Sequence, residues 1–140
     1  MTDDTTLQNY ENLQILKAIN TTILPSNLCS GLTNLNTVIT DPNKLKFIGE
    51  SCFQNTKLNA ETINDFINNS NLVISNNVFN GLNTNIITQT NRMKSYGNGI
   101  FTNISVNKII FNEPIINTNT FYNGKINTFA HGICNLSPSF

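Results

Sequence analysis

Apolar and polar positions follow one another in the same order five times along this chain. In each copy an aliphatic residue or a tyrosine precedes a small polar residue, three variable positions, an aromatic residue and a small polar pair. The aromatic position falls at residues 53, 79, 101 and 121, and Cys29 occupies it in a degenerate first copy, so the steps are 24, 26, 22 and 20 residues. Repeats of roughly 20–50 residues are typical of stacked-repeat proteins. The four complete copies are anchored by Ile48 with Phe53, Ile74 with Phe79, Tyr96 with Phe101, and Ile116 with Phe121.

Short extended segments are predicted ahead of each anchored motif. Residues 35–40 alternate in polarity and are rich in β-branched side chains, which is typical of a strand. The Asp-Pro-Asn sequence at 41–43 predicts a turn, after which residues 45–48 form a second strand. We expect corresponding extended segments in the later copies at residues 72–74, 85–88, 93–96, 108–111, 115–116 and 126–129.

Two segments have helical periodicity instead. An apolar residue recurs every third position from Leu7 to Ile19, which predicts an amphipathic helix that Pro25 prevents from continuing. We interpret residues 1–23 as a capping helix, because the ends of a solenoid expose apolar surface that needs a cover. The alternative is a docking helix for a partner. A second, shorter helix is expected at residues 60–67, where three apolar side chains share one face: Ile63, Phe66 and Ile67.

Together these elements predict one domain, a β-rich solenoid in which residues 24–140 form about five coils plus a partial last one. A single coil cannot bury its own apolar face, so stability is expected to come from contacts between neighbouring coils. We expect two apolar columns along the axis. One contains the phenylalanines of the anchors, and the other contains Val38, Ile86 and Ile109.

Asparagine makes up 28 of the 140 residues. With 39% hydrophobic residues and no net charge, the chain does not have the composition of a disordered protein. Asparagine tolerates turn and left-handed conformations, which a solenoid needs in every coil. An AT-rich genome would also enrich asparagine, and the sequence leaves both explanations open. We expect Asn76, Asn98 and Asn119 to share one repeat position, where stacked amides would bond along the axis. The alternative is an exposed polar surface that binds a glycan or a protein.

Charge and cysteine content narrow the classes of function. Eight basic and eight acidic residues give no net charge, so the chain lacks the basic surface of nucleic-acid binders. The acidic, polar N-terminal segment does not fit a secretory signal peptide, and no apolar run approaches the roughly 20 residues of a membrane span. We therefore expect no membrane insertion and a virion-associated or cytoplasmic protein, at the cell surface only as a fragment of a larger one. Cys29 and Cys52 fit buried apolar positions.

No group of residues has the spacing of a catalytic or metal site. His131 is the single histidine, and although Cys134 is close in sequence, nothing identifies an orienting group or an oxyanion hole. One histidine among scattered carboxylates does not make a metal site. The Gly-Asn-Gly sequence at 97–99 lacks the lysine and hydroxyl residue of a phosphate-binding loop. Glu50 and Glu113 are the acids nearest to the anchor loops and turns, and they lie in distant repeats. We predict no catalytic, cofactor-binding or metal-binding residues.

The anchored motif resembles the repeat unit of BspA-like leucine-rich repeat proteins, in which a strand and a turn precede Ile-Gly-x-x-Ala-Phe. Residues 45–55 match it best, with Ile48, Gly49 and Phe53 in register, whereas other copies replace the glycine and the alanine. The resemblance extends over residues 24–133. It implies leucine-rich-repeat-like coils of short strands with short helical or 3-10 turns. It also implies a non-enzymatic role in adhesion or protein–protein contact, in proteins of cell surfaces, viruses or phages.

Three hypotheses for function follow. The first is a non-enzymatic repeat module that contacts protein, as a structural or host-contacting component of a larger assembly such as a phage particle. Its exposed end strands would invite pairing with another chain, a second copy included. The second is a carbohydrate-binding or carbohydrate-acting β-solenoid, which would need a groove with paired carboxylates or exposed aromatic rings. The third is an intracellular scaffold, which differs from the first only in location.

Overall fold

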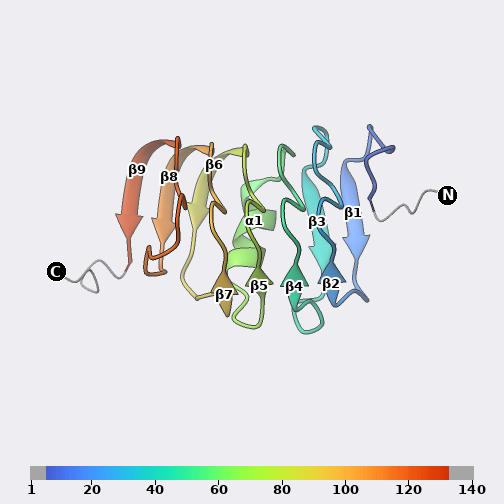
Figure 1. Ribbon diagram of the computed structural model, residues 1–140, viewed down its shortest axis with the longest axis horizontal. Coiled ribbons are helices and arrows are strands. Elements are labelled where there is room, and N and C mark those ends of the chain that lie inside the picture. The colour runs from blue at the N-terminus through green and yellow to red at the C-terminus, as the bar shows by residue number, and fades with distance from the viewer. Residues whose placement is uncertain (1–5, 133–140) are drawn as a thin grey trace.

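The computed structural model describes residues 6–132, and these form a β-solenoid of about five turns with a single short helix (Figure 1). Successive turns lie side by side along one axis, from β1 at the N-terminal end to β9 at the C-terminal end. The elements are β1 (Ile15–Ala18), β2 (Ile23–Leu24), β3 (Thr37–Thr40), β4 (Phe47–Ile48), α1 (Ala60–Ile67), β5 (Val73–Ile74), β6 (Asn83–Thr88), β7 (Ser95–Tyr96), β8 (Ser105–Phe111) and β9 (Lys125–His131).

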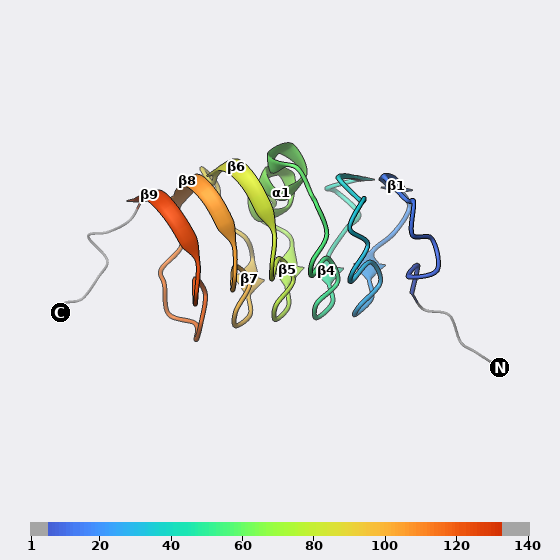
Figure 2. The ribbon, with the colours of Figure 1, turned by 90° about the horizontal axis from the view of Figure 1, so that it is seen from above.

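The strands form three parallel sheets on two sides of the core (Figure 2). The two-residue strands pair in the order β2–β4–β5–β7, and the longer strands lie opposite them as two sheets, β1–β3 and β6–β8–β9. Neighbouring strands come from successive coils, so that Ile48 pairs with Leu24 on one side and with Ile74 on the other. Parallel strands require a crossover connection, and the rest of each coil provides it.

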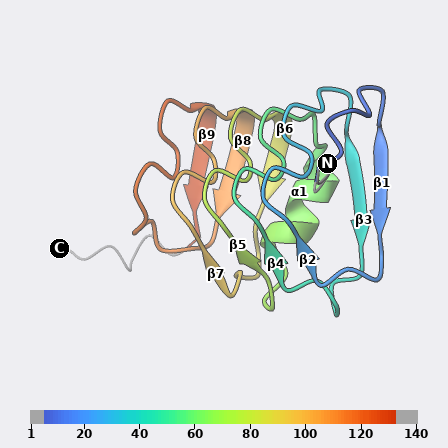
Figure 3. The ribbon, with the colours of Figure 1, turned by 45° about the vertical axis from the view of Figure 1, so that its right-hand side comes forward.

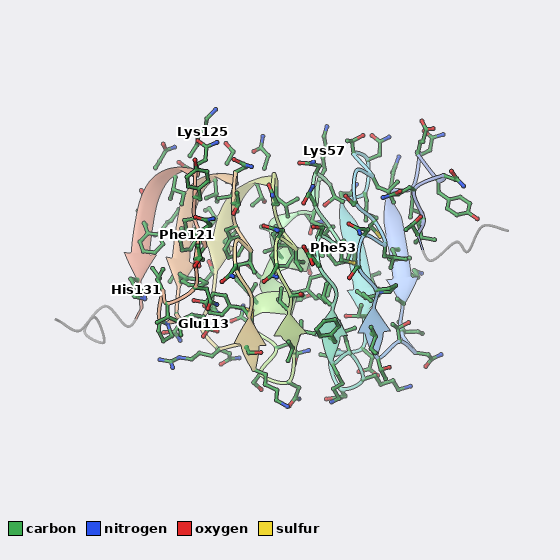
Figure 4. The ribbon with its side chains drawn as sticks, viewed as in Figure 1. Phe53, Lys57, Glu113, Phe121, Lys125 and His131 are labelled. Atoms are coloured by element: carbon green, nitrogen blue, oxygen red, sulfur yellow. The ribbon has the colours of Figure 1, made fainter. Side chains whose placement is uncertain are left out.

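Phenylalanine rings stack along the axis inside the coil. The ring centroids of Phe79 and Phe101 lie 5.6 Å apart, as do those of Phe101 and Phe121. Between Phe53 and Phe79 the ring of Phe66 from α1 is inserted, at centroid distances of 5.5 and 6.3 Å. These separations favour offset stacking. The column expected at the anchors is therefore present between Phe53 and Phe121 (Figure 4), and Phe66 is a member that the repeat pattern did not predict.

Residues with a positive φ fall in two columns, four residues apart, in the described part of the chain. Six of these ten residues are asparagine, three are glycine and one is serine, because the left-handed region penalises most side chains. Wherever a following coil is described, the backbone N–H of the left-handed residue donates to a carbonyl of that coil at 2.8–3.0 Å. The columns are Asn27, Ser51, Asn77, Gly99 and Asn119, and Gly31, Asn55, Gly81, Asn103 and Asn123.

The capping helix predicted within residues 1–23 is wrong for the part that the structure describes. Turns occupy residues 8–12, and strand β1 follows, paired in parallel with β3. Of the expected apolar stripe, Leu16 packs against the core whereas Ile19 is exposed. A strand at this place hydrogen-bonds the edge of β3, which a helix would leave open, and this pairing overrides the helical spacing of the sequence.

The helix predicted at residues 60–67 is confirmed as α1, and its expected inward residues are buried. Asn59 caps it, since its side-chain oxygen accepts a hydrogen bond from the N–H of Thr62 at 2.9 Å. This helix takes the place that a strand of the long-stranded side occupies in other coils, so that β3 and β6 belong to different sheets (Figure 3).

The apolar column predicted from Val38, Ile86 and Ile109 is wrong in its middle member. Ile86 is 41% exposed, and its neighbour Ile87 is the buried residue that pairs with Ile109. The error is one of register, because a shift of one residue along a strand moves a side chain to the opposite face. Val38 does not pair with this column, since α1 separates β3 from β6.

The inner position predicted for Ile116 is also wrong, because its side chain is 81% exposed and residues 115–116 form no strand. The side-chain amide of Asn117 instead donates to the carbonyl of Tyr96 at 2.6 Å. A side chain thus meets the edge of β7 where a further strand of the short-stranded sheet was expected.

Candidate interaction surfaces

Most of the predicted anchor residues serve the core rather than a surface. The side chains of Ile48, Ile74, Phe53, Phe79 and Phe101 are fully buried, whereas those of Tyr96 and Phe121 are partly buried against them. The hydroxyl of Tyr96 donates to the carbonyl of Pro114. Apart from exposed Ile116, the anchors therefore hold coils together, and surfaces able to bind a partner lie elsewhere.

The amide column predicted from Asn76, Asn98 and Asn119 is wrong in one member and in its bonding. The side-chain oxygen of Asn76 accepts from the N–H of Asn98 at 2.8 Å, and that of Asn98 accepts from the N–H of Thr118 at 3.2 Å. Asn119 lies one residue further on, in a left-handed column. These amides bond the backbone of the next coil. Direct amide–amide bonds occur between Asn107 and Asn127 and between Asn103 and Asn123.

A shallow polar depression of about 520 Å³ lies on the outer face of the β6–β8–β9 sheet. Amide side chains dominate it, and Lys125 contributes the one charged group among its lining residues. Figure 4 shows Lys125 projecting outward at this edge of the solenoid. Neither an aromatic ring nor a carboxylate lines the depression, so it lacks the groups that a carbohydrate groove was expected to have.

A second, more enclosed cleft of about 490 Å³ lies between β3 and α1. One wall is the whole of β3 with Pro42, and the other is α1, which contributes Glu61, Thr62, Asp65 and Phe66. Glu61 and Asp65 are exposed and are one helical turn apart. This cleft therefore combines a strand edge, apolar surface and two carboxylates.

The two sides of α1 meet their neighbouring strands differently. Toward β6, the side-chain oxygen of Asn64 accepts from the N–H of Thr88 at 2.9 Å, and the side-chain nitrogen of Asn68 donates to the Thr88 carbonyl at 3.0 Å. These two amides bond the edge of β6 as a strand would. Toward β3, the hydroxyl oxygen of Thr62 accepts from the N–H of Val38 at 3.3 Å. The cleft opens on this less occupied side.

A buried polar network crosses three coils near the C-terminal end. A carboxylate oxygen of Glu113 accepts from the side-chain nitrogen of Gln89 at 2.9 Å and from the N–H of Met93 at 2.8 Å. Gln89 also donates to the carbonyl of Ile67 at 2.8 Å. Burial raises the pKa of Glu113, and the two hydrogen bonds and nearby Arg92 only partly oppose that shift. The folded chain therefore favours the protonated form of Glu113 more than the unfolded chain does.

We expect Glu113→Gln to remove one component of the pH dependence of stability. The raised pKa means that the contribution of Glu113 is fully favourable below its ordinary value of 4.5 and is lost as the pH rises through the folded value. Urea unfolding from acidic to neutral pH should give a free-energy difference, variant minus native sequence, that increases with pH. A constant difference, or a variant that loses stability most at neutral pH, would contradict the role of burial.

The two cysteines expected at apolar positions are buried, and the single histidine lies against a backbone carbonyl. Cys29 and Cys52 are buried free thiols; burial raises the pKa of Cys29 to about 12 and raises that of Cys52 further, which keeps both protonated. A ring nitrogen of His131 lies 2.7 Å from the backbone carbonyl of Glu113 (Figure 4). Cys134 lies outside the described residues. Among residues 6–132, no three or more His, Cys, Asp and Glu side chains gather as a metal site.

Both ends of the solenoid expose large apolar side chains. In the described residues β1 pairs only with β3, and β9 pairs only with β8, so each has one edge without a strand. Phe129 faces the interior beside Ile109 yet is 41% exposed, because no described coil covers it. The exposed apolar residues are Tyr10, Ile15, Ile19 and Ile23 near the first coil, and Ile115, Ile116, Tyr122 and Phe129 in the last.

Comparisons with protein-family models, with curated proteins and with solved structures found no match for the chain. No helix among the described residues has the length and apolarity that crossing a bilayer requires. Function has to be argued from the surfaces themselves.

Neither the cleft beside α1 nor the network around Gln89 was predicted from the sequence. The short helix within a strand-rich repeat was a signal for the first, since a helix cannot complete a sheet. No such signal was present for the second, because Gln89 lies among polar neighbours, between Thr88 and Thr90.

Proposed function

We propose that this chain is a non-enzymatic repeat module that contacts protein through the open ends of its solenoid, within a larger assembly. The observation that carries the proposal is the last coil, where the seven-residue strand β9 pairs only with β8 among residues 6–132 and where Phe129 and Ile116 are exposed. Unpaired strand edges and contiguous exposed apolar groups are the features through which sheets join other chains.

The partner at these ends is a second copy in head-to-tail contact. All strands of the long-stranded side run in the same direction (Figure 1), so β1 of one copy would continue the sheet that ends at β9 of another. The short-stranded sheet does not continue in this way, because Asn117 bonds the carbonyl of Tyr96 at the edge of β7. On that side, exposed Ile116 of one copy would contact exposed Ile23 of the next. Such a contact uses two different surfaces and does not close on itself, which suits the extended components of a larger particle.

The resemblance of residues 45–55 to BspA-like repeats supports a leucine-rich-repeat-like module used for contact or adhesion. A structural or host-contacting part of a phage particle is the assembly that this resemblance favours. Carbohydrate binding is not favoured by the polar depression on β6–β8–β9, whose lining residues include no aromatic ring.

Substitutions at the two ends test the head-to-tail contact. Ile116→Lys at the C-terminal end and Ile23→Lys at the N-terminal end should each make the chain monomeric, because each copy then lacks one half of the interface. A mixture of the two variants should form dimers and nothing larger, because one intact half of each remains. Ile86→Lys in a middle coil, where the isoleucine is also exposed, is the matched control and should associate normally.

Sedimentation velocity over a wide concentration range measures these states. A native chain that stays monomeric throughout would contradict self-association. Association that Ile23→Lys leaves intact would show a symmetric contact between C-terminal ends instead.

A further inference from the structure

The cleft between β3 and α1 lies on the side of the solenoid, one strand in from β1, and it combines a strand edge, apolar surface and two carboxylates. β3 bonds β1 along one edge and belongs to a sheet of only these two strands. Its other edge faces the cleft, where the N–H of Val38 donates a hydrogen bond to the hydroxyl oxygen of Thr62. Beside it, the carbonyl of Asn36 accepts from the N–H of Asn59 at 2.8 Å and the carbonyl of Pro42 accepts from the side chain of Asn69 at 3.2 Å. The part of this edge that is open to a further hydrogen-bonding partner is therefore the Val38 carbonyl and Thr40.

Size and shape suit an extended peptide segment. The cleft volume of about 490 Å³ is in the range of ligand sites, roughly 300–1,000 Å³. β3 has four residues and is about 13 Å long, so a segment of similar length would lie beside the strand and bond its open part. Ile39 and Pro42 supply exposed apolar surface for its side chains, whereas Val38 and Phe66 form the buried floor of the cleft.

Charge identifies the kind of segment. Glu61 and Asp65 are the charged residues of the cleft lining, and no basic residue lines the cleft with them. Two like charges one helical turn apart repel one another. A lysine or arginine side chain placed between them would relieve that repulsion and form hydrogen bonds to both carboxylates.

We propose that this cleft binds an extended segment of a partner protein that carries a lysine or arginine. The segment pairs its backbone with the open part of the β3 edge, at the Val38 carbonyl and Thr40, and its basic side chain lies between Glu61 and Asp65. This is recognition by strand addition, in which main-chain hydrogen bonds supply affinity and side-chain contacts supply specificity. The site is separate from the ends that the proposed function uses.

A labelled peptide in which lysine alternates with valine is the probe, and its counterpart with glutamate in place of lysine is the ligand control. Fluorescence anisotropy at low salt should show binding of the lysine peptide only. Glu61→Gln combined with Asp65→Asn should weaken binding roughly 2- to 30-fold, as expected for the loss of two exposed charge pairs. Glu11→Gln combined with Glu50→Gln removes the same charge from exposed sites outside the cleft lining and should leave binding unchanged.

Hydrogen exchange distinguishes strand addition from attraction between charges alone. Saturating lysine peptide should slow amide exchange in β3, with β8 unaffected. The proposal is overturned if the glutamate peptide binds equally well, if the Glu61 and Asp65 variant binds as tightly as the native sequence, or if exchange in β3 does not change. A glycan array with binding that the same variant abolishes would assign the cleft to carbohydrate instead. All measurements use the Ile116→Lys background, so that failure of this site and failure of end-to-end association are read separately.

Discussion

Replacing Phe79 with alanine is expected to lower the free energy of unfolding by about 3–5 kcal/mol. Its ring is fully buried in the middle of the axial stack, between Phe66 at 6.3 Å and Phe101 at 5.6 Å. The loss combines the transfer energy of a large apolar side chain with the cavity that remains. Because Phe79 touches rings of the helix and of the next coil, the cavity would weaken two interfaces between coils.

Denaturant unfolding monitored by circular dichroism measures this loss. Phe47→Ala is the matched control, because its side chain is 36% exposed and lies outside the stack. We expect Phe47→Ala to lower the free energy of unfolding by no more than about half as much as Phe79→Ala, since less apolar surface is lost and no closed cavity forms. Equal losses for the two variants would show that the axial stack contributes no more than an ordinary surface ring.

Gly49→Ala is expected to lower the free energy of unfolding by about 3 kcal/mol, which is the upper part of the range for overpacking. A Cβ at this position would lie 2.4 Å from the backbone nitrogen of Ser26 and 2.8 Å from the carbonyl carbon of Pro25. Both atoms belong to the main chain of the preceding coil and cannot rotate away. Gly49 also donates its N–H to the carbonyl of Leu24 at 2.7 Å, so the clash would stretch the contact between coils.

Gly124→Ala provides the comparison for this prediction. A Cβ there would come no closer than 3.0 Å to any atom, and Gly124 does not require a positive φ. We expect Gly124→Ala to change the free energy of unfolding by no more than about 1 kcal/mol. The change can have either sign, because alanine also restricts the unfolded chain and thereby favours folding. The unfolding temperatures of the two variants and of the native sequence, measured by thermal unfolding, test this prediction. If Gly49→Ala unfolded at the native temperature, the coils would be less closely packed than the structure shows.

The repeat could be predicted from the sequence because the local requirements of the turn and the packing requirements of the core coincide at the anchors. Each phenylalanine must face inward, and the turn around it needs residues that accept a left-handed conformation, which asparagine, glycine and serine do. The axial spacing of Phe53 and Phe79 followed from that pattern alone. The helix at residues 60–67 was readable for a similar reason, since its apolar face and its cap lie within eight neighbouring positions.

The errors arose where a neighbouring coil decides the outcome. From Leu7 to Ile19 the three-residue spacing fits a helix, but the edge of β3 is satisfied by a strand. Ile86 and Ile87 are equally apolar, and only pairing with β8 selects which of them faces inward. The cleft beside α1 depends on the distance between the helix and the strand of the preceding coil, and no periodicity encodes that distance.

The uniform winding of the coil has a kinetic consequence. Paired strand residues are 20 to 26 positions apart, as in Ser105 with Lys125 and Phe47 with Val73. Divided by the chain length, this sequence separation is roughly 0.14–0.19, a range typical of domains that fold on the millisecond timescale or slower. No step has to close a loop much longer than one winding. Nucleation can thus begin at any adjacent pair of windings and spread in both directions, with the terminal windings the last to form and the first to open.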